Sequence, residues 1–197
     1  MITEAEKFLI SQGLNLSPSS GYNFNPNIEY FKVRDQYLKK YGFAIPNEHA
    51  LKTIAAASPI LEIGAGSGYW AHELRNAGAD VVATDPATGK YTIHKNGFWE
   101  FRWEAVERLP ANEAINIYSN RVLLTVWPDY DCEWPLKALE VYSGKNVFYI
   151  GEGDGGCTGN DAFHNYLSEH FGLVDEIGIP QFPGIHDRLF WYQRKRE

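Results

Sequence analysis

The chain has 197 residues, a length that suits one well-packed domain, and 44% of them are hydrophobic. Its formal net charge of -7 opposes non-specific binding to DNA or RNA, because that binding depends on basic residues that neutralise phosphates. Two cysteines are too few for a disulfide framework and form no CxxC pair, so we expect a reducing compartment and no metal site.

The first ten residues carry acids where a signal peptide would carry a basic segment. Nowhere along the chain is an uninterrupted apolar stretch long enough to cross a bilayer. We therefore expect a cytoplasmic protein that does not enter the membrane.

Residues 1–58 are predicted to form a helical cap or lid on the rest of the chain. Thr3 and Glu6 have the spacing of a capping box at the start of a first helix. Residues 14–27 are rich in Ser, Pro, Gly and Asn and predict a loop, while apolar residues recur at roughly helical spacing over residues 28–41.

Residues 59–197 are predicted to form the core, because strand and helix patterns alternate there. A buried strand over 60–63, a helix over 70–77 and a strand over 80–84 have the order of a parallel βαβ unit. The fold class is therefore α/β.

The rest of the core continues this alternation. Further strands are predicted over residues 98–103, 121–127 and 146–151, and helices over 135–142 and 160–171. Two final strands, "LVDEIGI" and "DRLFWYQR", are separated by a connection too short for a helix, so they are expected to pair antiparallel.

Three glycines follow the first core strand in the segment "ILEIGAGSGYW". Gly64, Gly66 and Gly68 predict a tight turn into a helix, whose backbone N–H groups can face a ligand. A nicotinamide-binding turn has its third glycine one place later, where this chain has Tyr69. This argues against a dinucleotide and a nicotinamide-dependent oxidoreductase.

Two carboxylates accompany the glycine turn. Asp85, at the end of the second strand, can accept hydrogen bonds from both hydroxyls of a ribose. Glu62 would repel a pyrophosphate but favours an ammonium or sulfonium group. Together they indicate a nucleoside that carries an amino acid.

At these residues the chain resembles the class I S-adenosylmethionine-dependent methyltransferases: "LEIGAGSGYW" and "VVATDP" match the family's first motif and its second-strand acid. The resemblance implies a Rossmann-like sheet of seven mostly parallel strands, with helices on both faces and a terminal antiparallel pair. It implies S-adenosylmethionine as cofactor, bound by Glu62, Gly64, Ala65, Gly66, Gly68, Tyr69 and Asp85. The segment "RWEAVERLP" resembles a fainter third motif, which places Glu104 and Ala105 beside the adenine.

The segment "WPDYD" resembles the D/N/S-P-P-Y/F/W motif of methyltransferases that modify amino nitrogens, with Trp127, Pro128, Asp129 and Tyr130 on its four positions. In that family the first side chain and a proline carbonyl hold the target N–H groups, and the last aromatic ring packs on the substrate. Trp127 and Asp129 depart from the motif, which puts amine or base methylation in doubt. Asp129 or Asp131 could supply the missing carboxylate, and an ordinary turn explains the segment equally well.

The Gly-rich segment "GEGDGGCTGND" follows the strand predicted over 146–151. It reads either as a substrate loop or as a mobile connection. The function expected from the resemblance is transfer of a methyl group to a small molecule or to an amine or nucleotide group. A non-catalytic module that binds S-adenosylmethionine is the alternative.

Overall fold

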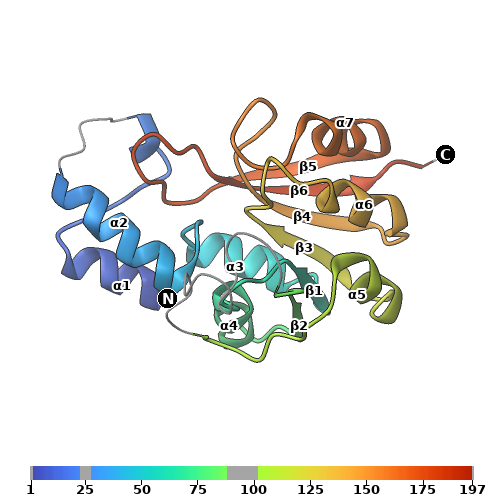
Figure 1. Cartoon of the computed structure of the whole chain (residues 1–197), viewed down its shortest axis with the longest axis horizontal. Coiled ribbons are helices and arrows are strands. Elements are labelled where there is room, and N and C mark those ends of the chain that lie inside the picture. The colour runs from blue at the N-terminus through green and yellow to red at the C-terminus, as the bar shows by residue number, and fades with distance from the viewer. Residues whose placement is uncertain (1, 23–27, 88–101, 197) are drawn as a thin grey trace.

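The computed structural model describes residues 2–22, 28–87 and 102–196. Six strands in these ranges form one sheet in the order β2-β1-β3-β4-β6-β5 (Figure 1). The strands are β1 Ile60–Ile63, β2 Val81–Thr84, β3 Val122–Val126, β4 Asn146–Gly151, β5 Phe171–Gly178 and β6 Arg188–Arg194.

The direction of the strands agrees with the predicted α/β class. β1 pairs in parallel with β2 and β3, and β3 pairs in parallel with β4. β6 runs antiparallel to both β4 and β5, so the predicted terminal antiparallel pair is confirmed. The sheet is therefore mixed, with a single reversed strand.

The expectation of seven strands is corrected to six within the described residues. Most of the strand predicted over 98–103 lies outside them, and Trp103 belongs to no strand. Its backbone N–H donates to the Ser67 carbonyl and its indole Nε1 to the Lys40 carbonyl, so Trp103 is held by the glycine turn and the N-terminal helices. In the described part of this segment, Glu107 forms a parallel bridge with Thr84 at the β2 edge.

Seven α-helices surround the sheet in the described residues. They are α1 Glu4–Ser11, α2 Ile28–Tyr41, α3 Glu48–Ala55, α4 Tyr69–Asn76, α5 Ala111–Ile117, α6 Trp134–Val141 and α7 Asp161–His170. A short 3₁₀ helix, η1, covers Ser20–Tyr22. The capping box predicted at the start of α1 is confirmed, because Thr3 and Glu6 exchange the expected hydrogen bonds.

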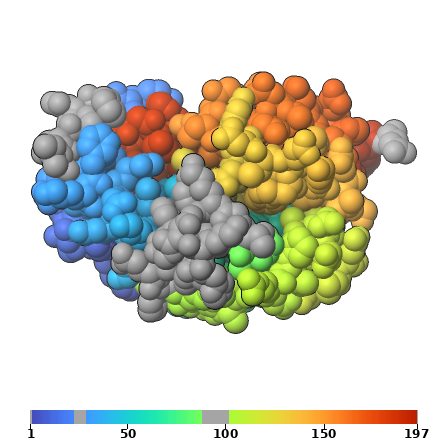
Figure 2. Space-filling model, in the orientation of Figure 1, coloured from blue at the N-terminus to red at the C-terminus, as the bar shows by residue number. Residues whose placement is uncertain are grey.

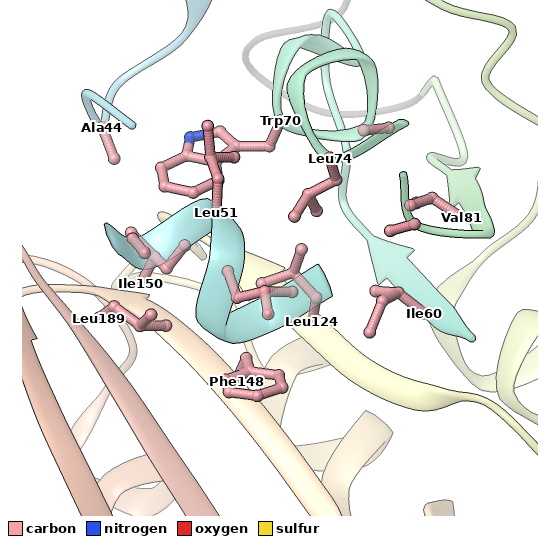
Figure 3. Packing of buried hydrophobic residues seen from close by; sticks show 14 of the residues in the cluster. Ala44, Leu51, Ile60, Trp70, Leu74, Val81, Leu124, Phe148, Ile150 and Leu189 are labelled. Carbon is pink, nitrogen blue, oxygen red and sulfur yellow. The ribbon is translucent and has the colours of Figure 1, made fainter. Parts of the chain in front are cut away.

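Alternation along the strands divides the core between the two faces of the sheet. Ile60 faces α3 and α4, whereas Leu61 and Ile63 face α5, α6 and α7. Figure 3 shows the first face, where Leu51, Trp70 and Leu74 meet Ile60, Leu124 and Phe148. The expected helices on both faces are thus present.

The N-terminal helices α1 and α2 form a third cluster at one end of the sheet (Figure 1). The connection between β5 and β6 reaches this cluster: the rings of Tyr37 and Phe182 lie 5.0 Å apart. In Figure 2 the red connection and the blue N-terminal segment lie side by side. α3 packs on the sheet itself, and the predicted division of the chain at residues 58 and 59 stays a prediction.

Candidate functional site

The glycine turn between β1 and α4 has the backbone that the sequence predicts. Gly64, Gly66 and Gly68 have φ angles of 67°, 53° and 76°, in the left-handed region that favours glycine. A Cβ at Gly64 would also lie 2.9 Å from the Trp134 ring. The turn therefore needs glycine for its conformation, and at Gly64 also for space.

Asp85 joins the end of β2 to this turn. Its Oδ2 accepts a hydrogen bond from the Gly66 N–H over 3.2 Å, and its Oδ1 accepts one from the Ala87 N–H over 2.7 Å. The side chain is half-buried at the carboxyl edge of the sheet. This is the edge where open α/β sheets bind ligands.

Glu62 places a second carboxylate at the same edge, and its side chain is almost completely buried, with 1% of the residue exposed. Its Oε2 has no hydrogen-bond partner among the described residues. Burial raises the pKa of Glu62 to about 8, although the Ala71 N–H and the Arg75 charge act in the opposite direction. An unpartnered buried carboxylate oxygen is a suitable partner for a cationic group.

A cavity of about 850 Å³ connects the glycine turn with the segment after β3. Many of the residues predicted for the site line it, namely Glu62, Gly64, Ala65, Gly66, Tyr69, Asp85, Trp127, Asp129 and Tyr130. The structure thus brings the predicted cofactor residues and the predicted acceptor residues to one place.

Four predicted residues lie outside this lining, namely Gly68, Glu104, Ala105 and Pro128. Glu104 Oε2 forms an ion pair with Arg75 Nη1 at 2.8 Å, and Glu104 Oε1 lies 3.0 Å from His72 Nδ1. The Glu104 carboxylate is therefore directed to α4. Ala105 is exposed. Farther along the chain, residues at the start of α5 line the cavity, namely Pro110, Ala111 and Asn112.

Tyr69 has a structural role besides lining the cavity. Its hydroxyl donates to Oε1 of Glu73 at 2.7 Å and accepts from the backbone N–H of Ala5 at 2.8 Å. The side chain is 1% exposed. Tyr69 therefore connects helix α1 to the start of α4, close to the glycine turn.

The segment 127–131, predicted to contact the acceptor, lines the cavity through Trp127, Asp129, Tyr130 and Asp131. The Pro128 carbonyl accepts a hydrogen bond from the Gly159 N–H over 2.9 Å, and Asp129 forms an antiparallel bridge with Thr158. The Tyr130 hydroxyl donates to Asp161, and 42% of Tyr130 is exposed. The loop after β4 thus supports the predicted acceptor segment.

In that loop, Glu152 is engaged in structural hydrogen bonds. Its Oε1 accepts from the His186 N–H and its Oε2 from the Cys157 N–H, each over 2.8 Å. Burial acts to raise the pKa of Glu152, but these N–H groups outweigh it and the pKa is lowered. Of this loop, Cys157 lines the cavity.

Sequence reasoning missed Asp187 and did not predict that Phe43 contacts Trp127. Phe43 stacks on the Trp127 ring, with the ring centroids 4.7 Å apart and an interplanar angle of 11°. Asp187 accepts a hydrogen bond from Trp127 Nε1 over 2.7 Å. Both contacts are long-range, and the sequence carries no local signal for either.

Within residues 2–22, 28–87 and 102–196, no group of three or more His, Cys, Asp or Glu side chains is placed to hold a metal ion. In the same ranges, every helix is too short or too polar to cross a membrane.

No family model matches the sequence, and no curated protein matches it. Solved structures do match. Sp1610 of Streptococcus pneumoniae, assigned as a tRNA (m1A22) methyltransferase, is 13% identical over 76% of this chain and 69% of its own, with a TM-score of 0.52. A structure concerned with the conversion of a disulfide bond into a thioacetal group during echinomycin biosynthesis is 13% identical over 79% of this chain and 84% of its own, with a TM-score of 0.50.

A third match is the N-methyltransferase NodS from Bradyrhizobium japonicum WM9 in complex with S-adenosylhomocysteine. It is 12% identical over 98% of this chain and 100% of its own, with a TM-score of 0.49. The two matches with TM-scores of 0.50 and above, taken with the strand order, show the fold. The chain has the Rossmann-like fold of the class I S-adenosylmethionine-dependent methyltransferases.

Proposed function

We propose that this protein is an S-adenosylmethionine-dependent methyltransferase that acts on a small molecule or on an amine or nucleotide group. The observation that carries the proposal is that one cavity is lined both by the glycine turn with Glu62 and Asp85 and by Asp129 and Tyr130. A donor and an acceptor can therefore meet inside it.

The residues present fit S-adenosylmethionine. Asp85 lies at the end of β2, where its carboxylate can accept hydrogen bonds from the hydroxyls of a ribose. The unpartnered Oε2 of Glu62 suits the amino acid ammonium of the ligand, and the left-handed glycines leave the backbone of the turn open to close approach. When bound, S-adenosylmethionine supplies a methyl group on a positively charged sulfur.

The protein contributes alignment and exclusion of water, since such a methyl group needs no further activation. In this proposal Asp129 orients the acceptor and takes its proton, while Tyr130 and Trp127 pack against it. Pro128 would hold the segment, because its carbonyl is already bonded to Gly159. The roles proposed for Glu104 and Ala105 at the adenine stay predictions, as does the cytoplasmic location.

The alternative, a non-catalytic module that binds S-adenosylmethionine, has less support. Such a module needs no space beyond the cofactor, whereas the cavity is also lined by Asp129 and Tyr130. The departures from the acceptor motif at Trp127 and Asp129 are the observations in its favour.

Calorimetric titration with S-adenosylmethionine, S-adenosylhomocysteine and NAD tests the proposal. We expect micromolar dissociation constants for the first two ligands and no heat with NAD. Transfer of a tritiated methyl group to a panel of amines, nucleosides and small heterocycles then identifies the acceptor. Absence of binding by a protein shown to be folded would refute the proposed cofactor.

A further inference from the structure

Trp127 has an unusual backbone conformation directly after β3. Its φ angle is 53°, and Ala87 is the only other described residue besides glycine with a positive φ. A bulky side chain is disfavoured in this region, so it persists only where surrounding contacts hold it. Such residues concentrate at functional sites, which makes the contacts of Trp127 informative.

Three separate parts of the chain hold Trp127. Its backbone N–H donates to the Ile150 carbonyl of β4 over 2.7 Å, and its indole Nε1 donates to Oδ1 of Asp187 over 2.7 Å. The ring stacks on Phe43, which precedes α3, at 4.7 Å and 11°. The sheet therefore holds the backbone of Trp127, while the connection between β5 and β6 and the N-terminal segment hold its indole.

Asp187 is an acid in a position where burial disfavours its charged form. It is 2% exposed, and burial raises its pKa to about 8, with the Glu152 charge acting in the same direction and the Trp127 hydrogen bond opposing it. Apolar residues of similar volume often stabilise a core as well as a buried acid does. What Asp187 provides instead is a fixed acceptor for the Trp127 indole.

The wall held in this way borders the cavity. Trp127 and Phe43 both line it, together with Tyr130 and Trp134. Flat aromatic walls favour flat ligands, and their faces also attract cations.

The charges along the cavity select further. Among the described lining residues, the acids besides Glu62, which burial keeps protonated below about pH 8, are Asp85, Asp129 and Asp131, and the cation is Lys137. Lys137 is ion-paired with Glu133 at 2.6 Å. An anionic ligand is therefore disfavoured by the field of the cavity.

We propose that Asp187 is a positioning residue that holds Trp127 and Phe43 as a flat wall for the methyl acceptor. We further propose that this acceptor is an aromatic amine or a nitrogen heterocycle without net negative charge. Both statements rest on the proposed methyltransferase function and specify its acceptor class.

Binding of three probes tests the wall without the natural acceptor. The probes are 2-naphthylmethylamine, which is flat and cationic, 2-naphthoate, which is flat and anionic, and cyclohexylmethylamine, which is cationic but not flat. Each is titrated into protein saturated with S-adenosylhomocysteine. We expect 2-naphthylmethylamine to bind about 10-fold more tightly than either of the others.

Variants at the hydrogen bond test the role of Asp187. In Asp187→Ala we expect about 10-fold weaker binding of 2-naphthylmethylamine, because the indole loses its acceptor. Asp187→Asn keeps an oxygen acceptor and should bind the probe within about 2-fold of the native protein. Asp175→Ala, which removes an exposed acid of β5, is the control and should change nothing.

A spectroscopic readout separates positioning from general stability. The indole N–H resonance that disappears in Trp127→Phe identifies Trp127, and its hydrogen exchange should be slow in the native protein and in Asp187→Asn. If Asp187→Ala does not fold, Trp127→Phe removes the same hydrogen bond from the donor side while keeping a ring to stack on Phe43. Fast exchange in the native protein, or unchanged probe binding in Trp127→Phe, overturns the positioning role.

The acceptor class fails if 2-naphthoate binds as tightly as 2-naphthylmethylamine, or if no probe binds. Titration of S-adenosylhomocysteine alone shows separately whether the proposed function holds. If that ligand binds and the probes do not, only the acceptor class is wrong. If S-adenosylhomocysteine does not bind, the probes are titrated into the free protein. The same comparison of affinities then tests whether Trp127 and Phe43 form a flat binding wall.

Discussion

The backbone N–H of Gly66 donates a hydrogen bond to Oδ2 of Asp85 over 3.2 Å, which joins the glycine turn after β1 to the end of β2. The second oxygen, Oδ1, accepts from the N–H of Ala87 over 2.7 Å. The carboxylate is thus oriented at the cavity before a ligand binds. Such preorganisation reduces the entropy that binding would otherwise cost.

Replacement of Asp85 tests the ribose position. Asp85→Ala should weaken binding of S-adenosylhomocysteine by on the order of 1–3 kcal/mol, through loss of a charge-assisted hydrogen bond. Asp85→Asn keeps one oxygen acceptor and should recover part of this loss. Calorimetry measures both, with Asp80→Ala at the opposite end of β2 as a control that leaves affinity unchanged. Native affinity in Asp85→Ala would place the ribose elsewhere.

Glu62 should make stability depend on pH. Burial raises its pKa from 4.5 to about 8, with the Ala71 N–H and Arg75 opposing, so over this range the folded state holds a proton that the unfolded chain has released. The free energy of unfolding should therefore fall as the pH rises from about 4.5 to about 8. Asp187, with a pKa raised to about 8 mainly by burial, contributes with the same sign.

Urea unfolding across this pH range measures the effect. Glu62→Gln and Asp187→Asn should each flatten the dependence in part, and the double variant should flatten it further. A native slope in the double variant would mean that neither acid keeps its proton on folding.

Ligand binding should release that proton. An ammonium beside Glu62 favours its ionised form, so binding of S-adenosylhomocysteine near pH 7 should expel a proton from the raised carboxyl. Calorimetric enthalpies in buffers with different ionisation enthalpies give the number of protons released. Glu62→Gln should release fewer protons. Equal release by both proteins would mean that the ammonium does not bind beside Glu62.

Asp129 should affect turnover more than cofactor affinity. If Asp129 takes the acceptor's proton, Asp129→Asn should lower methyl transfer by about 10²-fold while S-adenosylhomocysteine binds as before. Tritium transfer to the acceptor found by screening measures turnover. Asp131→Asn is the matched variant, since Asp131 lines the same cavity and is exposed. Normal turnover in Asp129→Asn would make Asp129 a turn residue.

Tyr69 should stabilise the contact between α1 and α4. Tyr69→Phe leaves the Ala5 N–H and Glu73 Oε1 without their buried hydroxyl partner and should lower the free energy of unfolding by about 1–3 kcal/mol. Tyr118→Phe, which removes an exposed hydrogen bond to Glu107, should change it by less than about 0.5 kcal/mol. Urea unfolding compares the two, and equal losses would contradict the structural role of Tyr69.

Local patterns in the sequence predicted much of the fold. Glycine spacing, caps and apolar periodicity act within a few residues, which is why the glycine turn, the capping box at Thr3 and the strand over Asn146–Gly151 are confirmed. The acids at Glu62 and Asp85 were placed near each other for a general reason, since parallel strands end at one edge.

Other elements had weaker local signals. Helix α5, Ala111–Ile117, was not predicted, because it has seven residues and too little apolar periodicity to be recognised. The sequence predicts a strand that ends at Trp103, but the hydrogen bonds from Trp103 to Ser67 and Lys40 hold this residue outside the sheet. Competition between such partners is decided only when the chain is folded.

By itself the sequence determined the α/β class, the glycine turn and the two carboxylates beside it, because each depends on backbone conformation or strand order. The tertiary structure decided how the acceptor end is built. The Trp127–Asp187 hydrogen bond spans 60 positions, and Phe43 stacks on the same indole from the N-terminal segment. Contacts between residues so far apart leave no periodicity in the sequence, since packing of the whole chain brings them together.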